Sequence, residues 1–162
     1  PRQHRLIGHV PLYFFVRPLA VIDPRSYLGL RLKDDLVLEL LEMNDLEIQY
    51  AIDLLHENIP DAYWIKAAEL GFTLKADEFQ VIVCAFVYLR PNEGHQSFDG
   101  IMPGIDIVNG SIPALGQPSK TGKYQDTSWV RYDKTDISIN LSIDSVGPKM
   151  ICLMLPSQVP RP

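Results

Sequence analysis

The clearest alternation of apolar and polar residues lies in the C-terminal third of the chain. From 137 to 143, isoleucine or leucine alternates with a polar side chain, which is typical of a strand with one buried face and one wet face. This pattern predicts strands over 128–133, 136–143 and 149–155, separated by short polar turns. The C-terminal end is therefore expected to form a three-strand antiparallel meander.

Two regions nearer the N-terminus also have strand character. Residues 78–90 are mostly apolar and rich in valine and isoleucine, which predicts a central strand buried on both faces, although a buried helical segment fits the same periodicity. Residues 5–32 contain β-rich runs interrupted by prolines, which cannot donate to a strand ladder. We therefore expect short strands there, at least one of them at a sheet edge.

Residues 34–71 have apolar positions at helical spacing. A first helix is predicted from Asp34 to Met43, and a second over 45–57, because the Asn44-Asp45 pair both stops and restarts helices. A third helix is predicted over 61–71, ending at a glycine that favours a left-handed cap. The pattern thus predicts a three-helix segment inserted between strands.

Residues 91–126 interrupt these patterns, since they contain six of the ten glycines and four of the thirteen prolines. Only 105–108 has strand character, so we expect a long irregular loop, a kind of segment that is usually functional or mobile. The stretch 116–123 does not fit a phosphate-binding loop, because five residues separate its glycines and Tyr124 follows its lysine. It is interpreted as a polar loop.

These elements predict an α+β fold in which 1–162 forms a single soluble domain with the long Gly/Pro-rich loop 91–126. Its parts would be a mainly antiparallel sheet from both ends of the chain, the inserted three-helix segment and the C-terminal meander. Hydrophobic residues make up 46% of the chain and charged residues 22%, which is ordinary for a globular protein. The longest apolar run, 81–89, is shorter than the roughly 20 residues that span a bilayer. We therefore expect no membrane association and, by default, a reducing cytoplasmic location.

The charges are separated along the chain more strongly than the net charge of −5 suggests. Residues 1–33 contain six basic side chains and one acid, whereas residues 34–65 contain nine acids and neither lysine nor arginine. Five of these acids fall at predicted helix starts, where they complement the helix dipole. The excess is either neutralised by the basic N-terminal segment or offered to a basic partner. The same acidity argues against nucleic-acid binding, as does the single lysine of the third predicted helix.

Candidate catalytic groups gather in the long loop, where Glu93, His95, Asp99 and Asp106 have side chains suited to acid–base work or metal ligation. Their spacing matches no metal-binding signature, so no metal and no cofactor are expected. Cys84 and Cys152 lie in apolar runs and are interpreted as small buried hydrophobes. They can form a disulfide only if their two strands are neighbours.

The function that this pattern favours is a non-catalytic binding protein that docks a basic protein partner on an acidic helical face, an inhibitor or immunity-type protein being one form. One alternative is a small hydrolase or metal-dependent enzyme with its site in loop 91–126, and another is a structural subunit of a larger assembly. The predicted partner-binding residues are five acids with two aromatic anchors: Asp35, Glu39, Glu42, Asp53, Glu57, Tyr63 and Trp64.

Overall fold

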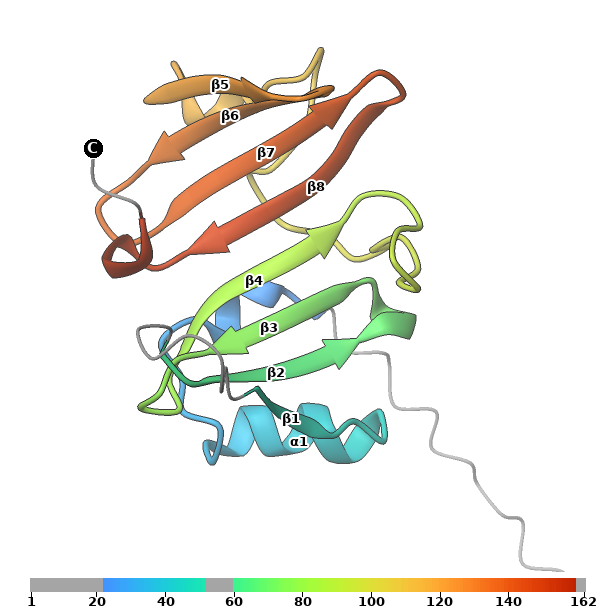
Figure 1. Ribbon diagram of the computed structural model, residues 1–162, viewed down its shortest axis with the longest axis vertical. Helices are drawn as coiled ribbons and strands as arrows, with labels where there is room; N and C mark the ends of the chain where they lie inside the picture. Colours follow the sequence, from blue (N-terminus) through green and yellow to red (C-terminus); the bar gives the residue numbers. More distant parts are fainter. Residues whose placement is uncertain (1–21, 52–59, 160–162) are drawn as a thin grey trace, which may run out of the picture.

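The strands of this chain pair into one eight-stranded antiparallel sheet in the computed structural model, which describes residues 22–51 and 60–159 (Figure 1). The strand order is β1-β2-β3-β4-β8-β7-β6-β5, so two four-stranded meanders join where β4 pairs with β8. Their bounds are Ile48–Ala51 (β1), Ala62–Ala67 (β2), Phe72–Ala76 (β3), Ile82–Tyr88 (β4), Lys120–Tyr124 (β5), Thr127–Asp133 (β6), Ser138–Asp144 (β7) and Gly147–Met154 (β8).

The register of the sheet separates its side chains into two faces, because successive residues of a strand point to opposite sides. One row of directly opposed residues crosses six strands on the buried face, and every member is at most 3% exposed. It runs from β2 to β6 through Ile65, Leu74, Ala85, Leu153, Ile139 and Tyr132. This row forms the floor of the hydrophobic core.

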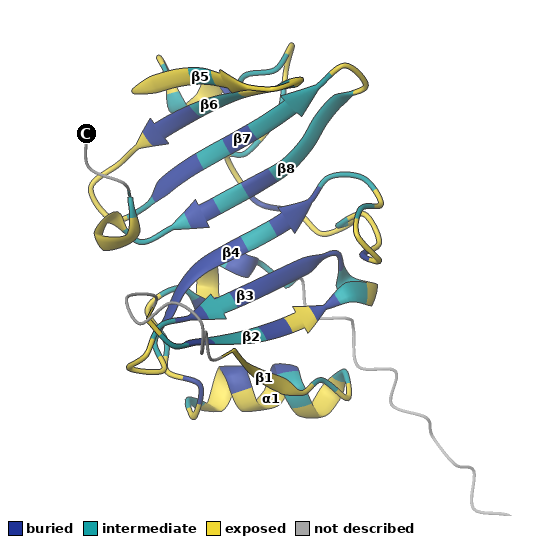
Figure 2. Cartoon of the chain, in the orientation of Figure 1, coloured by how far each residue is buried: buried dark blue, intermediate teal, exposed yellow. Residues whose placement is uncertain are grey.

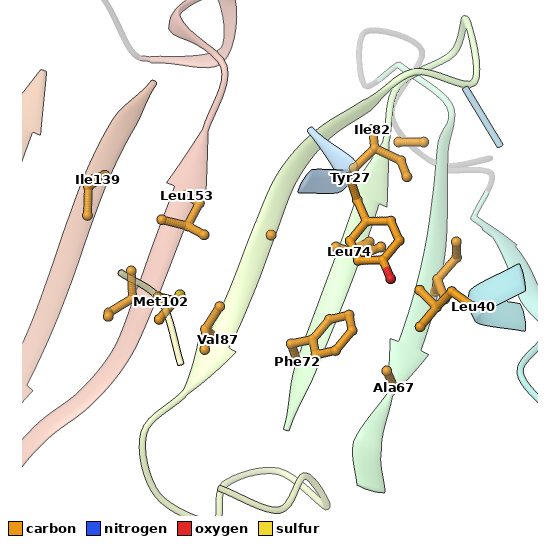
Figure 3. Close-up of a cluster of buried hydrophobic side chains, with 14 of the residues drawn as sticks. Tyr27, Leu40, Ala67, Phe72, Leu74, Ile82, Val87, Met102, Ile139 and Leu153 are labelled. Atoms are coloured by element: carbon orange, nitrogen blue, oxygen red, sulfur yellow. The ribbon is translucent and has the colours of Figure 1, made fainter. Parts of the chain in front are cut away.

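The helix α1 (Asp35–Met43), the 3-10 turn η1 (Pro24–Tyr27) and part of the long loop cover this face. Leu40 of α1 is 3% exposed, and the ring of Tyr27 stacks on Phe72 with their centroids 6.4 Å apart. Figure 3 shows these side chains converging over the sheet, with Met102 of the loop at its other end. Burial of each large side chain contributes roughly 2 kcal/mol to folding, so α1 is held mainly by its inner face.

The opposite face of the sheet carries a mixture of aromatic, polar and sulfur-containing side chains. Trp64 and Phe86 stack there with centroids 6.0 Å apart, and the Nζ of Lys75 lies 5.5 Å from the Trp64 ring. Many residues of this face are only half-buried, as Figure 2 shows by its alternation of dark and lighter bands along the strands. We call it the open face, because α1 and η1 both pack on the other side.

The predicted three-helix segment is wrong, since the described residues contain a single α-helix, α1. Its predicted start and end are confirmed, with Asn44 as its C-cap. The region of the second predicted helix contains β1 instead, while residues 52–59 lie outside the described part of the chain. The third is replaced by β2 and a short 3-10 turn, Ala68–Leu70, which Gly71 caps with the expected left-handed φ of 74°.

These errors have a physical reason. β2 is apolar on both faces, so its residues show no simple alternation and fit helical spacing by coincidence. Hydrogen bonds to β3 and the strand preference of Tyr63 and Trp64 decide its conformation. The structure is therefore dominated by a sheet, and the expected α+β balance is not found.

The other strand predictions met different outcomes. The central strand within 78–90 and the three C-terminal strands are confirmed as β4, β6, β7 and β8. The prediction of a polar loop over 116–123 is wrong from Lys120 onward, where the edge strand β5 begins, and 105–108 forms only an isolated bridge from Val108 to Ser111. In the N-terminal region, the described residues form η1 and a one-residue bridge from Arg31 to Val81, while residues 1–21 lie outside the description. No described helix has the length and apolar character needed to cross a bilayer.

Candidate functional site

The outer face of α1 exposes three of the predicted partner-binding acids. Asp35, Glu39 and Glu42 all point away from the core, because Val37 and Leu40 fill it at the intervening helical positions. Leu38 and Met43 are 40% and 63% exposed beside these acids. The five exposed side chains line a shallow hollow of about 480 Å³, which we call the α1 surface: Asp35, Leu38, Glu39, Glu42 and Met43.

The charges of the α1 surface are not paired with basic groups in the described residues. The ion pairs among the described residues lie elsewhere: Arg25 with Asp23, Arg90 with Asp144, and Arg131 with Asp133. Burial opposes ionisation of Asp23, but its hydrogen bonds from Arg25 prevail and lower the pKa of this carboxyl. Arg25 is thus engaged locally instead of neutralising α1, and Arg2, Arg5 and Arg17 lie outside the described residues.

The other predicted partner-binding residues do not join the α1 surface. Tyr63 and Trp64 are consecutive on β2 and therefore lie on opposite faces of the sheet, Tyr63 against the core and Trp64 on the open face. Asp53 and Glu57 lie outside the described part of the chain. The predicted set therefore does not form one helical face, and its described helical portion consists of Asp35, Glu39 and Glu42.

Asp61 shows that helix starts explain only part of the acidity of residues 34–65. It lies just before β2, and its carboxylate accepts a hydrogen bond from the hydroxyl of Tyr50 on β1. This hydrogen bond is the main reason that the pKa of Tyr50 is raised to about 12. The carboxylate of Asp61 therefore connects two strands and does not cap a helix.

A second candidate site is a hollow of about 480 Å³ on the open face, which we call the His95 hollow. Two of the four candidate catalytic groups, Glu93 and His95, line it, whereas Asp99 and Asp106 are exposed elsewhere on the loop. Its other walls come from the first four strands: Gln49, Tyr50, Ala51, Trp64, Lys66, Thr73 and Tyr88. A neighbouring hollow of about 300 Å³ shares Trp64, Tyr88 and Glu93 with it.

A tight turn sets the position of His95. Asn92 and His95 exchange backbone hydrogen bonds of 3.1 and 2.8 Å, and Glu93 and Gly94 between them have φ values of 50° and 82°. Two successive left-handed residues are the signature of a type I′ turn, which glycine at the second position favours. The turn returns the chain over the end of β4, so the His95 ring stacks on Tyr88 with centroids 4.1 Å apart.

His95 is buried, with 9% of its surface exposed. Its Nε2 lies 2.8 Å from the Oγ1 of Thr73, while its buried Nδ1 has no hydrogen-bond partner among the described residues. Burial is the main cause of a raised pKa for Tyr88; the nearby Glu93 carboxylate raises it further, and a hydrogen bond with Thr73 opposes both. The side chains of Thr73, Tyr88 and His95 form one buried polar cluster beneath the hollow.

The chemistry available to this cluster is limited by access. A nucleophile must reach its substrate, and Thr73 is only 3% exposed, on a strand in the middle of a four-stranded meander. The His95 ring also has no carboxylate bonded to Nδ1 in the described chain to orient it as a base. Within the same residues, no group of three or more His, Cys, Asp or Glu side chains is placed to hold a metal ion.

Sequence reasoning named Trp64 only as a partner-binding anchor and missed Thr73 and Tyr88 as walls of the His95 hollow. Trp64, Thr73 and Tyr88 lie on three different strands, and only strand pairing brings them together. Thr73 did carry a weak signal, because it is a polar residue between buried Phe72 and Leu74. Comparison with protein-family models, with curated proteins and with solved structures gave no match.

Proposed function

We propose that this chain is a non-catalytic binding protein that docks a basic protein partner on the α1 surface. The observation that carries the proposal is the combination of three exposed carboxylates with exposed Leu38 and Met43 on a single helix face. Apolar contacts surrounded by charged groups are the usual composition of a specific interface. The carboxylates would steer a basic partner, and the apolar side chains would supply contact area that excludes water.

The rigidity of the surface supports this function. Leu40 and Val37 fix α1 to the core, and the amide of Asn44 closes its last turn by donating to the Leu40 carbonyl at 2.9 Å. A preformed helix pays less ordering entropy on binding than a mobile segment does. An inhibitor that covers a phosphate-binding surface of its target would need such a fixed array of negative charge, so an inhibitor or immunity-type role is the form of binding that we favour.

The test compares charge reversal on α1 with matched reversal elsewhere. The Glu39→Lys/Glu42→Lys variant changes the α1 surface, and Glu78→Lys/Asp136→Lys makes the same change of net charge at two exposed turn residues. Partners captured by the wild-type chain from its native source are identified by mass spectrometry and purified. Their affinity for each variant is then measured by calorimetry at low and high salt.

We expect the α1 reversal to weaken binding at least about tenfold, which is about 1.4 kcal/mol, and to flatten its salt dependence. The matched variant should bind nearly as well as the wild type. Truncation of Met43 to alanine should weaken binding without changing the salt dependence, because it removes apolar contact only. Equal affinities for the two charge-reversed variants would refute docking on α1.

A second candidate function is a small hydrolase centred on the His95 hollow. It is favoured by the presence of Glu93 and His95, two candidate acid–base groups, in the same hollow beside Lys66. A screen against ester, phosphoester and glycoside substrates would detect such an activity, and His95→Ala should abolish it. Activity that persists in His95→Ala would exclude His95 as the base.

A further inference from the structure

The two cysteines lie next to each other on the open face of the sheet. β4 and β8 are adjacent, with Phe86 directly opposite Cys152 and Cys84 directly opposite Met154. Cys84 and Cys152 are therefore diagonal neighbours on the same face of an antiparallel pair. A disulfide between them requires that their strands be neighbours, and this condition is met. Both cysteines are free thiols.

Contacts on both sides of Cys84 favour its thiolate. Cys152 lies at the diagonal position on β8, and Lys75 lies directly opposite Cys84 on β3. A hydrogen bond from the Cys152 thiol, assisted by the charge of Lys75, lowers the pKa of Cys84 although burial opposes it. The same hydrogen bond, together with burial, raises the pKa of Cys152. One sulfur is thus prepared as the nucleophile and the other is held beside it as a thiol.

We propose that Cys84 and Cys152 form a reversible dithiol–disulfide site that a small peroxide oxidises. Cys84 is 7% exposed and Cys152 is half-buried, so a molecule the size of hydrogen peroxide reaches them far better than a bulky disulfide does. Cys84 is the attacking sulfur, and Cys152 is the resolving sulfur that completes the bond.

The reaction takes two steps. The Cys84 thiolate attacks one peroxide oxygen, the O–O bond breaks, and the departing hydroxide takes up a proton to form water, which leaves a sulfenic acid on Cys84. The Cys152 sulfur then attacks the Cys84 sulfur, and the S–O bond breaks as hydroxide leaves with the Cys152 proton as a second water. Overall, two thiols and one hydrogen peroxide give one disulfide and two waters. The two sulfurs lose two electrons, and the two peroxide oxygens gain them.

The position of the pair also predicts that the bond is easily reduced. Diagonal neighbours in an antiparallel pair have Cα atoms roughly 7–8 Å apart, whereas disulfides span at most about 6.8 Å. Closing the bond therefore requires β4 and β8 to shift locally, and disulfides formed under such strain are the labile ones. Oxidation would act directly beside Phe86, which stacks on Trp64 in the wall of the neighbouring hollow.

The experiment treats the purified full chain with hydrogen peroxide and maps its unreduced peptides by mass spectrometry. Wild-type protein should lose both thiols together and give one peptide crosslinked between Cys84 and Cys152 within a single chain, which dithiothreitol reverses. Peptide mapping separates this product from oxidation of Met150 and Met154, which flank Cys152 on the same strand face.

Single variants identify the role of each sulfur. In Cys152→Ser, Cys84 should still react but stop at a sulfenic acid that dimedone traps. In Cys84→Ser, we expect Cys152 to react at least about tenfold more slowly than Cys84 does in Cys152→Ser, because Lys75 lies directly opposite Cys84 and acts on Cys152 only from one strand further away. Lys75→Met should slow the reaction of Cys84 several-fold while leaving the final crosslink unchanged. The wild-type result does not depend on whether any variant folds.

Three outcomes would overturn the proposal. These are two free thiols that survive peroxide in the folded wild type, a Cys84 sulfenic acid that persists beside an intact Cys152, and crosslinks found only between separate chains. Because the pair lies on the open face and the α1 surface on the other, each of these results leaves the proposed docking function untouched.

Discussion

The Oγ1 of Thr73 and the Nε2 of His95 lie 2.8 Å apart and form a buried hydrogen bond between β3 and the turn that follows β4. Replacing Thr73 by valine keeps the shape of the side chain but leaves a buried ring nitrogen without its partner. Such a loss costs about 1–3 kcal/mol. Thr73→Val should lower the free energy of unfolding in urea by this amount, while Thr73→Ser, which keeps the hydroxyl, should lower it by less.

The close approach of Gly71 to Phe98 leads to a second prediction. Gly71 has a φ of 74°, and a Cβ placed there would lie 2.4 Å from the backbone nitrogen of Phe98. That nitrogen donates to the Tyr88 carbonyl at 2.7 Å, so an alanine would push the loop carrying His95 away from β4. Gly94 has a similar φ of 82° but open space around it, which makes it the matched control.

We expect Gly94→Ala to lower the unfolding free energy by about 1 kcal/mol, the cost of left-handed backbone in a residue with a Cβ. Gly71→Ala should lower it by clearly more than this and should also increase amide exchange around residues 95–98. Equal losses in the two variants would show that the contact with Phe98 is unimportant.

Attachment of α1 to the core is tested by two leucines on its opposite sides. Leu40 is 3% exposed and Leu38 is 40% exposed. Truncation of a buried leucine to alanine costs about 2–5 kcal/mol, because it removes apolar burial and leaves a cavity. Leu40→Ala should therefore destabilise the fold by this amount in chemical denaturation. Leu38→Ala should have a much smaller effect on stability and instead weaken partner binding.

The hydrogen bond between Tyr50 and Asp61 predicts a pH dependence at the alkaline end. Because it raises the pKa of Tyr50 to about 12, the folded state favours the neutral phenol. The stabilisation is fully present below the ordinary tyrosine pKa of about 10 and disappears as the pH rises through 12. Ultraviolet titrations of the wild type and of Tyr50→Phe should differ by one tyrosine that ionises near pH 12, while the raised pKa values of Tyr27 and Tyr88 remain in both proteins.

Asp61→Asn is the companion variant in that titration. The amide keeps an oxygen acceptor for the Tyr50 hydroxyl but removes the carboxylate charge that disfavours the phenolate. The late transition should therefore move toward lower pH without disappearing. A transition that stays near pH 12 in Asp61→Asn would assign the shift to another neighbour.

Parts of the fold could be predicted because their local pattern had a single structural solution. Residues 137–143 alternate strictly because one side of β7 packs in the core and the other side is partly hydrated. The helix α1 was predictable within a residue, since its apolar positions recur at helical spacing between Asp34 and Asn44. The exposed acids Asp35, Glu39 and Glu42 followed directly from that periodicity.

Other parts were decided by contacts between distant segments. β2 was mistaken for a helix because both of its faces are partly apolar, and only its pairing with β3 shows it to be a strand. Glu93 and His95 could be named from the sequence as candidate groups, but their neighbour Thr73 is 22 residues from His95 along the chain. Nothing local in the sequence links them.

Local pattern was thus enough to predict the segments that face water on one side and the core on the other, because such segments repeat apolar residues with a period of two or of 3.6. Which strands lie side by side depends on the folded chain, and so do the His95 hollow and the placement of Cys84 diagonal to Cys152. Strand pairing uses backbone hydrogen bonds that every residue except proline can make, so its partners leave little trace in the order of the side chains.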